Sequence, residues 1–150
     1  MKTLAATEDL AEIRARIGRL APGDTGQWGS MNAAQAVCHM RDSLCCPLGE
    51  RMVAPLKPPI PPAMRKWLAL WFPREWPRGV PTTPEMNQEI GGTRPMEFAL
   101  DRAGLLEKLD AFAVGKGPWP AHPIFGAMTQ KEWMRWGYLH ADHHLRQFGR

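Results

Sequence analysis

The stretch over residues 133–148, near the C-terminus, constrains the fold most, because it has the pattern of a long amphipathic helix. It contains no proline, one glycine and long side chains at most positions. Thr129 and Glu132 form a capping-box pattern, in which the hydroxyl accepts from the N–H three residues later and the carboxylate reaches back. Gly149 ends the pattern. We therefore predict a helix that begins after the Thr129 cap and runs to Phe148.

This helix carries three of the chain's five histidines, His140, His143 and His144. Residues four apart lie on the same side of a helix, so His140 and His144 can direct their imidazole nitrogens at one point. His143 lies about 100° around the helix from His144. His140 and His144 border an apolar stripe made of Met134, Gly137, Tyr138, Ala141, Leu145 and Phe148. We therefore predict that His140 and His144 face inward and His143 outward; His140 with His143 is the alternative pair.

Two histidines at this spacing are a weak metal signal alone, since a histidine-rich helix end explains them equally well. An open zinc-type site needs three protein ligands, and the third candidate is His39. His39 flanks the apolar stripe of a helix predicted over residues 31–46, with Ser30 as the cap candidate. Taken alone, His39 has the features of a core or boundary residue with a satisfied hydrogen bond.

Two further helices are predicted, over residues 8–20 with Thr7 as the cap and over residues 102–114 with Asp101 as the cap. With the two histidine-bearing helices, they predict an all-α fold, a four-helix bundle. The length of 150 residues fits one domain over residues 1–150. If the second and fourth helices pack together, His39 meets His140 and His144, which leaves an open position on a metal ion.

The long crossover between the second and third helices, over residues 50–84, is rich in proline and tryptophan. Nine prolines lie between Pro55 and Pro84, and residues 62–72 form a very apolar short helix with proline in its first turn. We interpret this segment first as a flap on the domain's own core and second as a dimer contact. A substrate lid and a membrane-surface contact are the other interpretations.

Composition excludes several classes of protein. The net charge is +4, but lysine and arginine are scattered, which does not indicate a nucleic-acid partner. No apolar run approaches the roughly 20 residues of a membrane span, and no secretory signal is present. The three cysteines, Cys38, Cys45 and Cys46, lack the spacing of a disulfide framework and favour a reducing, cytoplasmic setting.

Several short motifs together cover both ends of the chain: Trp28-Gly-x-Met31, Gln35-x3-His39, His122-Pro-x-Phe-Gly126-x-Met-Thr129, Trp133, and His140-x2-His143-His144-Leu-x-Gln147-Phe148. With them the chain resembles the DinB/YfiT-like superfamily, within it a subfamily without an assigned function. The resemblance implies an up-down-down-up bundle, often dimeric, with a divalent metal on His39, His140 and His144. It implies that His143 is not a ligand. His122 anchors its own loop or, alternatively, contacts the metal ligands or the substrate.

The resemblance implies metal-dependent transferases that add low-molecular-weight thiols to electrophiles, and related isomerases that use a thiol cofactor. We therefore expect an enzyme of the thiol S-transferase type, in which the metal activates a bound thiol. A hydrolase, in which the metal activates water, is the sister possibility. The expected ion is zinc or nickel, with iron or manganese as alternatives, and the expected partner is a small molecule such as a low-molecular-weight thiol. No general base is obvious; the candidates are Gln35, Asp42, His122 and His143. The alternatives are a non-catalytic, metal-binding or stress-associated bundle and a bundle without metal, whose histidines only pack.

Overall fold

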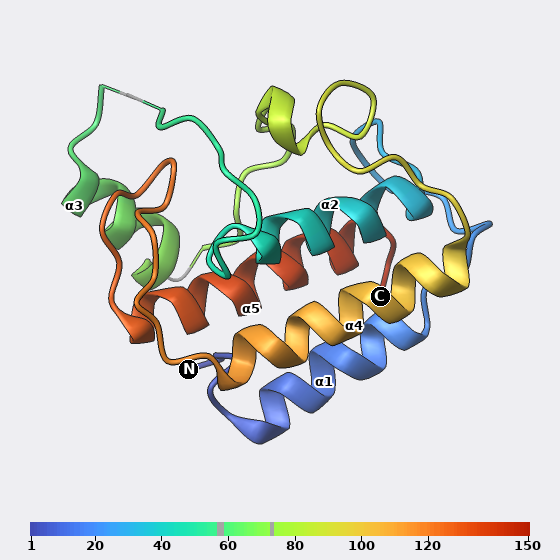
Figure 1. The fold of residues 1–150 in the computed structure, drawn as a ribbon, viewed down its shortest axis with the longest axis horizontal. Helices are drawn as coiled ribbons and strands as arrows, with labels where there is room; N and C mark the ends of the chain where they lie inside the picture. The colour runs from blue at the N-terminus through green and yellow to red at the C-terminus, as the bar shows by residue number, and fades with distance from the viewer. Residues whose placement is uncertain (57–58, 73) are drawn as a thin grey trace.

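The computed structural model describes residues 1–56, 59–72 and 74–150, and within them the fold is all-α, as predicted (Figure 1). Four long helices and three short ones occur, and these residues form no β-strand. The long helices are α1 (Thr7–Gly18), α2 (Ala33–Cys45), α4 (Phe98–Val114) and α5 (Gln130–Gln147). The short ones, all between α2 and α4, are α3 (Pro62–Lys66), the π-helix η1 (Trp67–Trp71) and the 3-10 helix η2 (Pro84–Met86).

The cap of α5 is the one that the sequence predicts. The Thr129 hydroxyl accepts from the backbone N–H of Glu132 at 3.2 Å, and the Glu132 carboxylate accepts from the N–H of Thr129 at 2.8 Å. This reciprocal pair satisfies two of the N–H groups that a helix start leaves without a partner. The start of the helix that carries three histidines is therefore set by local chemistry alone.

The other three cap predictions, Thr7, Ser30 and Asp101, are wrong. Thr7 lies inside α1, whose cap position is Ala6. α2 is capped by Asn32 instead of Ser30, because Asn32 and Gln35 form a capping box of their own.

α4 begins four residues earlier than predicted, at Phe98 instead of residue 102. Glu97 caps it by accepting from the N–H groups of Ala99 and Leu100 at 3.0 and 3.1 Å. Asp101 therefore lies in the first turn, where it accepts from the N–H of Met96 at 2.9 Å.

The core lies between the four long helices. In Figure 1, α2 and α5 lie side by side, and α4 and α1 run along the opposite edge of the molecule. α2 packs on α4 and α5, and α1 packs on α4 and α5. Burial of their apolar faces removes large side chains from water, which is the main favourable term in folding. The largest fully buried side chains are Trp133, Phe112, Leu4, Ile13, Ile17, Leu20, Met40, Leu70, Leu105, Leu109, Met134 and Leu145.

The crossover packs on this core through one side of its short helices. Leu70 of η1 is fully buried, whereas Trp67 and Leu68 are 52% and 43% exposed. The Trp76 indole N–H donates to the carbonyl of Ala69 at 2.7 Å, which ties the following segment to η1. These contacts agree with the flap interpretation. Lys57, Pro58 and Pro73 of the predicted crossover lie outside the described residues.

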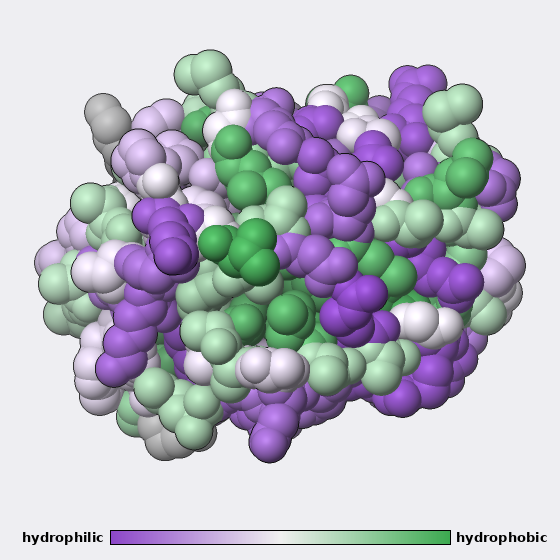
Figure 2. Space-filling view, turned by 60° about the horizontal axis from the view of Figure 1, so that its bottom comes forward, coloured by the Kyte–Doolittle hydropathy of each residue, from purple (hydrophilic) through white to green (hydrophobic). Residues whose placement is uncertain are grey.

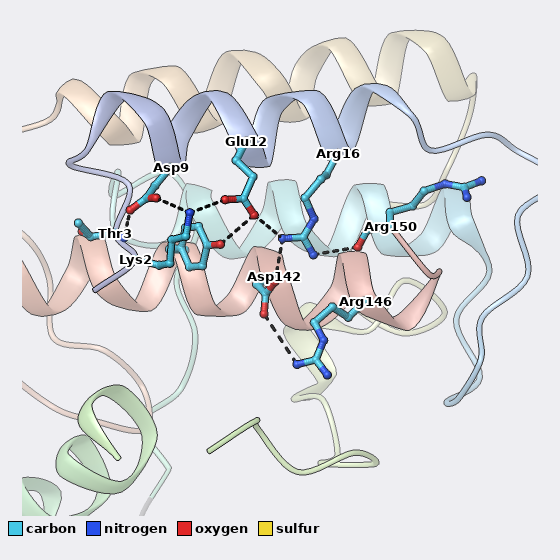
Figure 3. Close-up of polar contacts among 9 residues, drawn as sticks. Lys2, Thr3, Asp9, Glu12, Arg16, Asp142, Arg146 and Arg150 are labelled. Atoms are coloured by element: carbon cyan, nitrogen blue, oxygen red, sulfur yellow. Dashed lines mark hydrogen bonds and ion pairs between the residues drawn. The ribbon is translucent and has the colours of Figure 1, made fainter. Parts of the chain in front are cut away.

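A polar network holds α1 against α5 on a partly buried seam (Figure 3). The buried guanidinium of Arg16 donates to Asp142 Oδ1 at 2.7 Å and to the carbonyl of Arg150 at 2.8 Å. Glu12 accepts from the Tyr138 hydroxyl at 3.0 Å. Because buried charges are costly unless they are paired, these bonds also define how the two helices align.

The surface carries both polar side chains and exposed large apolar ones. Figure 2 shows the face along which α1 runs, where hydrophilic and hydrophobic side chains alternate in small groups. Within the described residues, no helix is both long enough and apolar enough to cross a bilayer.

Gly137 of α5 is required where three elements come together. A Cβ at this position would lie 2.7 Å from Leu4 Cδ1 and 2.7 Å from Phe112 Cε1. We expect Gly137→Ala to lower the free energy of unfolding by about 1–3 kcal/mol, as overpacking typically does. This loss should outweigh the higher helix propensity of alanine. Guanidinium unfolding followed by circular dichroism measures it.

Gly104→Ala in α4 is the matched control. A Cβ there meets only the flexible side chain of Arg41, at 3.3 Å from Nη1. We expect its free energy of unfolding to stay unchanged or to rise by up to about 1 kcal/mol, which is the helix-propensity difference. Equal effects of the two substitutions would contradict the packing role of Gly137.

Candidate metal centre

His39 of α2 meets His140 and His144 of α5, the arrangement that the helix periodicity predicts. One ring nitrogen from each of the three lies within 4.8 Å of the other two. The ring centroids are 5.3 Å apart for His39 and His140, 4.6 Å for His39 and His144, and 4.7 Å for His140 and His144. Three nitrogens at these distances are close enough to bind one metal ion.

The three imidazoles are held in their neutral form. Burial lowers the pKa of His39 below its usual value and lowers the pKa values of His140 and His144 well below theirs. The proximity of the rings adds to this effect for His140 and His144, because each cation would repel the others. A neutral imidazole has one nitrogen lone pair free to bind a metal.

The tautomer of His39 follows from its hydrogen bond. Its Nδ1 lies 3.0 Å from the carbonyl oxygen of Met86, which can only accept. Nδ1 must therefore carry the proton, and Nε2 must carry the lone pair. Metal-binding histidines commonly donate their second N–H to a carbonyl in this way.

A second chain of bonds defines the tautomer of His144. The side-chain NH₂ of Gln147 donates to the carbonyl of Trp28 at 2.7 Å, so its Oε1 faces the other way. That Oε1 lies 3.2 Å from Nδ1 of His144, which must donate to it. Nε2 of His144 is therefore the nitrogen with the free lone pair.

Gly29 makes room for this chain. Its φ is +76°, which favours glycine, and a Cβ there would lie 2.7 Å from Gln147 Nε2. The motif Trp28-Gly29 therefore places both the acceptor carbonyl and the space that Gln147 needs.

His140 is held by aromatic rings. It stacks on Trp136 with a centroid distance of 5.0 Å and an interplanar angle of 19°. Trp76, from the crossover, lies 6.3 Å from it. The crossover thus covers the histidine cluster, a contact that the sequence pattern did not indicate.

His143 lies beside the cluster instead of within it. Its half-buried ring is 6.1 Å from the rings of both Trp28 and Trp76 and 5.2 Å from that of His144. It lines a cavity of about 270 Å³ that also reaches His144. The cavity is therefore an access route to the cluster; its other lining residues include Gln35, Gln88, Glu89, Gly79 and Thr82.

His122 anchors the loop before α5, the first of its two predicted roles. Its Nδ1 accepts from the N–H groups of Ile124 and Phe125 at 3.0 and 3.4 Å. The ring packs against Trp133 and Trp136 at 5.3 and 5.2 Å. Burial lowers the pKa of His122 to about 3, so it is neutral at physiological pH.

The candidate general bases Gln35 and Asp42, and the thiol of Cys38, differ in whether they can react with a molecule in the cavity. Gln35 lines the cavity, but its Oε1 caps α2 and its Nε2 donates to Glu89 at 3.2 Å. Asp42 is buried and bonded to Thr93 and Gln88, away from the cavity. Burial raises the pKa of Cys38 to about 12, so this residue offers no thiolate at neutral pH.

A family model described as "Protein of unknown function (DUF1569)" matches residues 2–150. No curated protein and no solved structure matches the chain.

His122 should make stability depend on pH. Its pKa is about 3 in the folded protein and about 6.5 when unfolded, so below about pH 6.5 the unfolded chain binds more protons. Its contribution to stability is complete above that pH and falls as the pH decreases toward 3. At pH 5 the loss relative to pH 7.5 is about 2 kcal/mol.

His122→Asn is the test, because an Asn oxygen can still accept from the loop N–H groups but does not titrate. We expect guanidinium unfolding in the presence of a chelator to show a smaller loss from pH 7.5 to pH 5 in the variant. The other buried histidines contribute to both proteins and cancel in the comparison. An identical pH dependence in the two proteins would refute the assignment.

Proposed function

The chain belongs to the DUF1569 family, and we propose that it binds one divalent metal ion through His39, His140 and His144 and uses that ion in catalysis. The reaction class is thiol transfer or hydrolysis, with a small-molecule substrate bound in the cavity beside His144. One observation carries the proposal: three neutral imidazole nitrogens lie within 4.8 Å of one another between two core helices.

We further propose that the family is part of the DinB/YfiT-like superfamily and that the helices form an up-down-down-up four-helix bundle. Pairs of contacts support this topology. α1 and α5 run parallel, since Leu4 meets Met134 and Arg16 meets Asp142. α1 and α4 run antiparallel, as the pairs Arg14–Asp110 and Gly18–Arg102 support. α2 and α5 also run antiparallel, as the pairs Gln27–Gln147 and His39–His140 support.

The donor set suits a divalent ion of intermediate softness. Imidazole nitrogens bind zinc and nickel well, and iron and manganese are the alternatives. A bound ion of this kind lowers the pKa of a thiol or water molecule and so supplies a nucleophile at neutral pH. Three protein ligands leave a further position for that molecule, as in catalytic zinc sites.

The surrounding residues orient the reactants and exclude water. Trp28 and the segment that contains Gly79 and Thr82 form walls of the cavity. Trp76 covers His140 and His143. Within the described part of the chain, the His143 ring makes no hydrogen bond, so it is the group placed to accept a proton from a thiol or water in the cavity.

A non-catalytic, metal-stabilised protein is the second candidate, and the position of the histidines favours it. An ion on His39, His140 and His144 would join α2 to α5, two helices that pack against each other. Binding to the folded state alone raises stability by mass action. A homodimer and a cytoplasmic setting also stay predictions; three free thiols agree with a reducing compartment.

Elemental analysis of protein purified without a histidine tag tests metal binding. We expect about one divalent ion per chain in the wild type and a loss of that ion in His144→Ala, because two remaining nitrogens hold the ion much more weakly. His143→Gln is the matched control and should retain the ion. A wild type that takes up no metal after incubation with zinc, nickel, iron and manganese would overturn the proposal.

Cobalt substitution separates a catalytic from a structural site. We expect the visible spectrum of the cobalt-loaded protein to change when a small thiol such as 2-mercaptoethanol or glutathione is added, because the thiolate would occupy the open position. Saturable binding of thiol supports the enzyme. If no thiol, azide or change in pH alters the spectrum, the catalytic role is rejected and the metal has a structural role.

A further inference from the structure

Asp42 is the most completely buried charged residue described and lies one turn after His39 on α2. It is 1% exposed. Its Oδ2 accepts from the N–H of Thr93 at 2.7 Å and from Gln88 Nε2 at 3.3 Å, and its Oδ1 accepts from the Thr93 hydroxyl at 2.7 Å. Arg51 Nη2 pairs with Oδ1 at 3.3 Å. Burying a carboxylate without such donors is strongly unfavourable, and these four contacts compensate the buried charge.

All of these donors hold one short segment between the crossover and α4, residues 85–93. Arg51 also donates to the carbonyls of Glu85 and Gly91 at 2.8 and 3.0 Å. The ends of the segment are therefore tied to the same carboxylate–guanidinium pair. Gly92 allows its tight turn, since a Cβ there would lie 2.9 Å from the backbone of Asn87.

The segment carries two parts of the candidate site. The Met86 carbonyl accepts from Nδ1 of His39 at 3.0 Å. The following residues, Asn87, Gln88 and Glu89, line the cavity beside His144. The same anchor thus holds a hydrogen-bond acceptor for the cluster and a wall of its access route.

We propose that Asp42 is a positioning residue for His39. It acts through the 85–93 segment, keeps the Met86 carbonyl against Nδ1, and so directs the Nε2 lone pair toward His140 and His144. Its effect on metal affinity rests on the proposed function; its effect on the His39 tautomer does not. Asp42 is therefore no longer a candidate for the general base, because it bonds the segment and does not line the cavity beside His144.

The experiment compares Asp42→Asn with Asp101→Asn. Asp101 is the matched control, because it is also a buried aspartate. Its Oδ2 accepts from the backbone N–H of Met96 at 2.9 Å, and its Oδ1 lies 3.7 Å from Arg41 Nη1. It does not bond the 85–93 segment. Both variants replace one acceptor oxygen by an NH₂ group and remove the negative charge, so a general loss of stability should affect both.

Two measurements test whether Asp42 positions His39. Long-range ¹H–¹⁵N NMR of metal-free protein reports the His39 tautomer, and competition with a zinc chelator reports the zinc affinity. We expect Asp42→Asn to change the His39 pattern from a single Nδ1–H tautomer to a mixture and to weaken zinc binding about 10–100-fold, as loss of a ligand's hydrogen-bond partner does. Asp101→Asn should keep both wild-type values.

Wild-type values of both quantities in Asp42→Asn would overturn the inference. If this variant does not fold, Thr93→Val decides in its place, since it removes one hydroxyl donor to Asp42 and keeps the shape; the same shifts, smaller in size, are expected. A wild type that binds none of zinc, nickel, iron and manganese would refute the proposed function, while the His39 tautomer in metal-free protein would still test Asp42.

Discussion

The structure depends on the burial of three uncharged imidazoles between α2 and α5. Burial keeps the rings neutral, and a neutral ring has one N–H that needs an acceptor and one lone pair that is free. Met86 supplies the acceptor for His39, and Gln147 supplies it for His144. These two bonds also connect the cluster to segments outside the helices, at Met86 and, through Gln147, at Trp28.

The proline-rich crossover and the 85–93 segment after it can supply such contacts because most of their backbone is not helical. Backbone carbonyls in a helix are used by the helix, whereas those in an irregular segment are free to accept from side chains. Met86 is at the end of the 3-10 helix η2, where its carbonyl accepts from His39. The same crossover brings Trp76 over His140 and lines the cavity. The segment with the unusual proline and tryptophan content therefore forms part of the candidate site.

Sequence patterns predicted the parts of the structure that depend on local chemistry. The capping box at Thr129 and the inward pair on α5 follow from hydrogen-bond geometry and helix periodicity. Two of the three wrong cap predictions lie where two nearby residues compete for one role. Glu97 and Asp101 can both cap α4, and the choice depends on where the preceding segment packs. Met86 had no signal at all, because a backbone carbonyl has no side-chain signature.

The sequence by itself determined the all-α class and the helix faces, since periodicity and capping act within one or two turns. It also marked His39, His140 and His144 as the residues that meet if α2 and α5 pack together. Only the tertiary structure decided which nitrogen of His39 and of His144 is free, that Asp42 anchors residues 85–93, and that Gly137 must be small. Each of these depends on contacts between residues far apart in the chain, which no local pattern encodes.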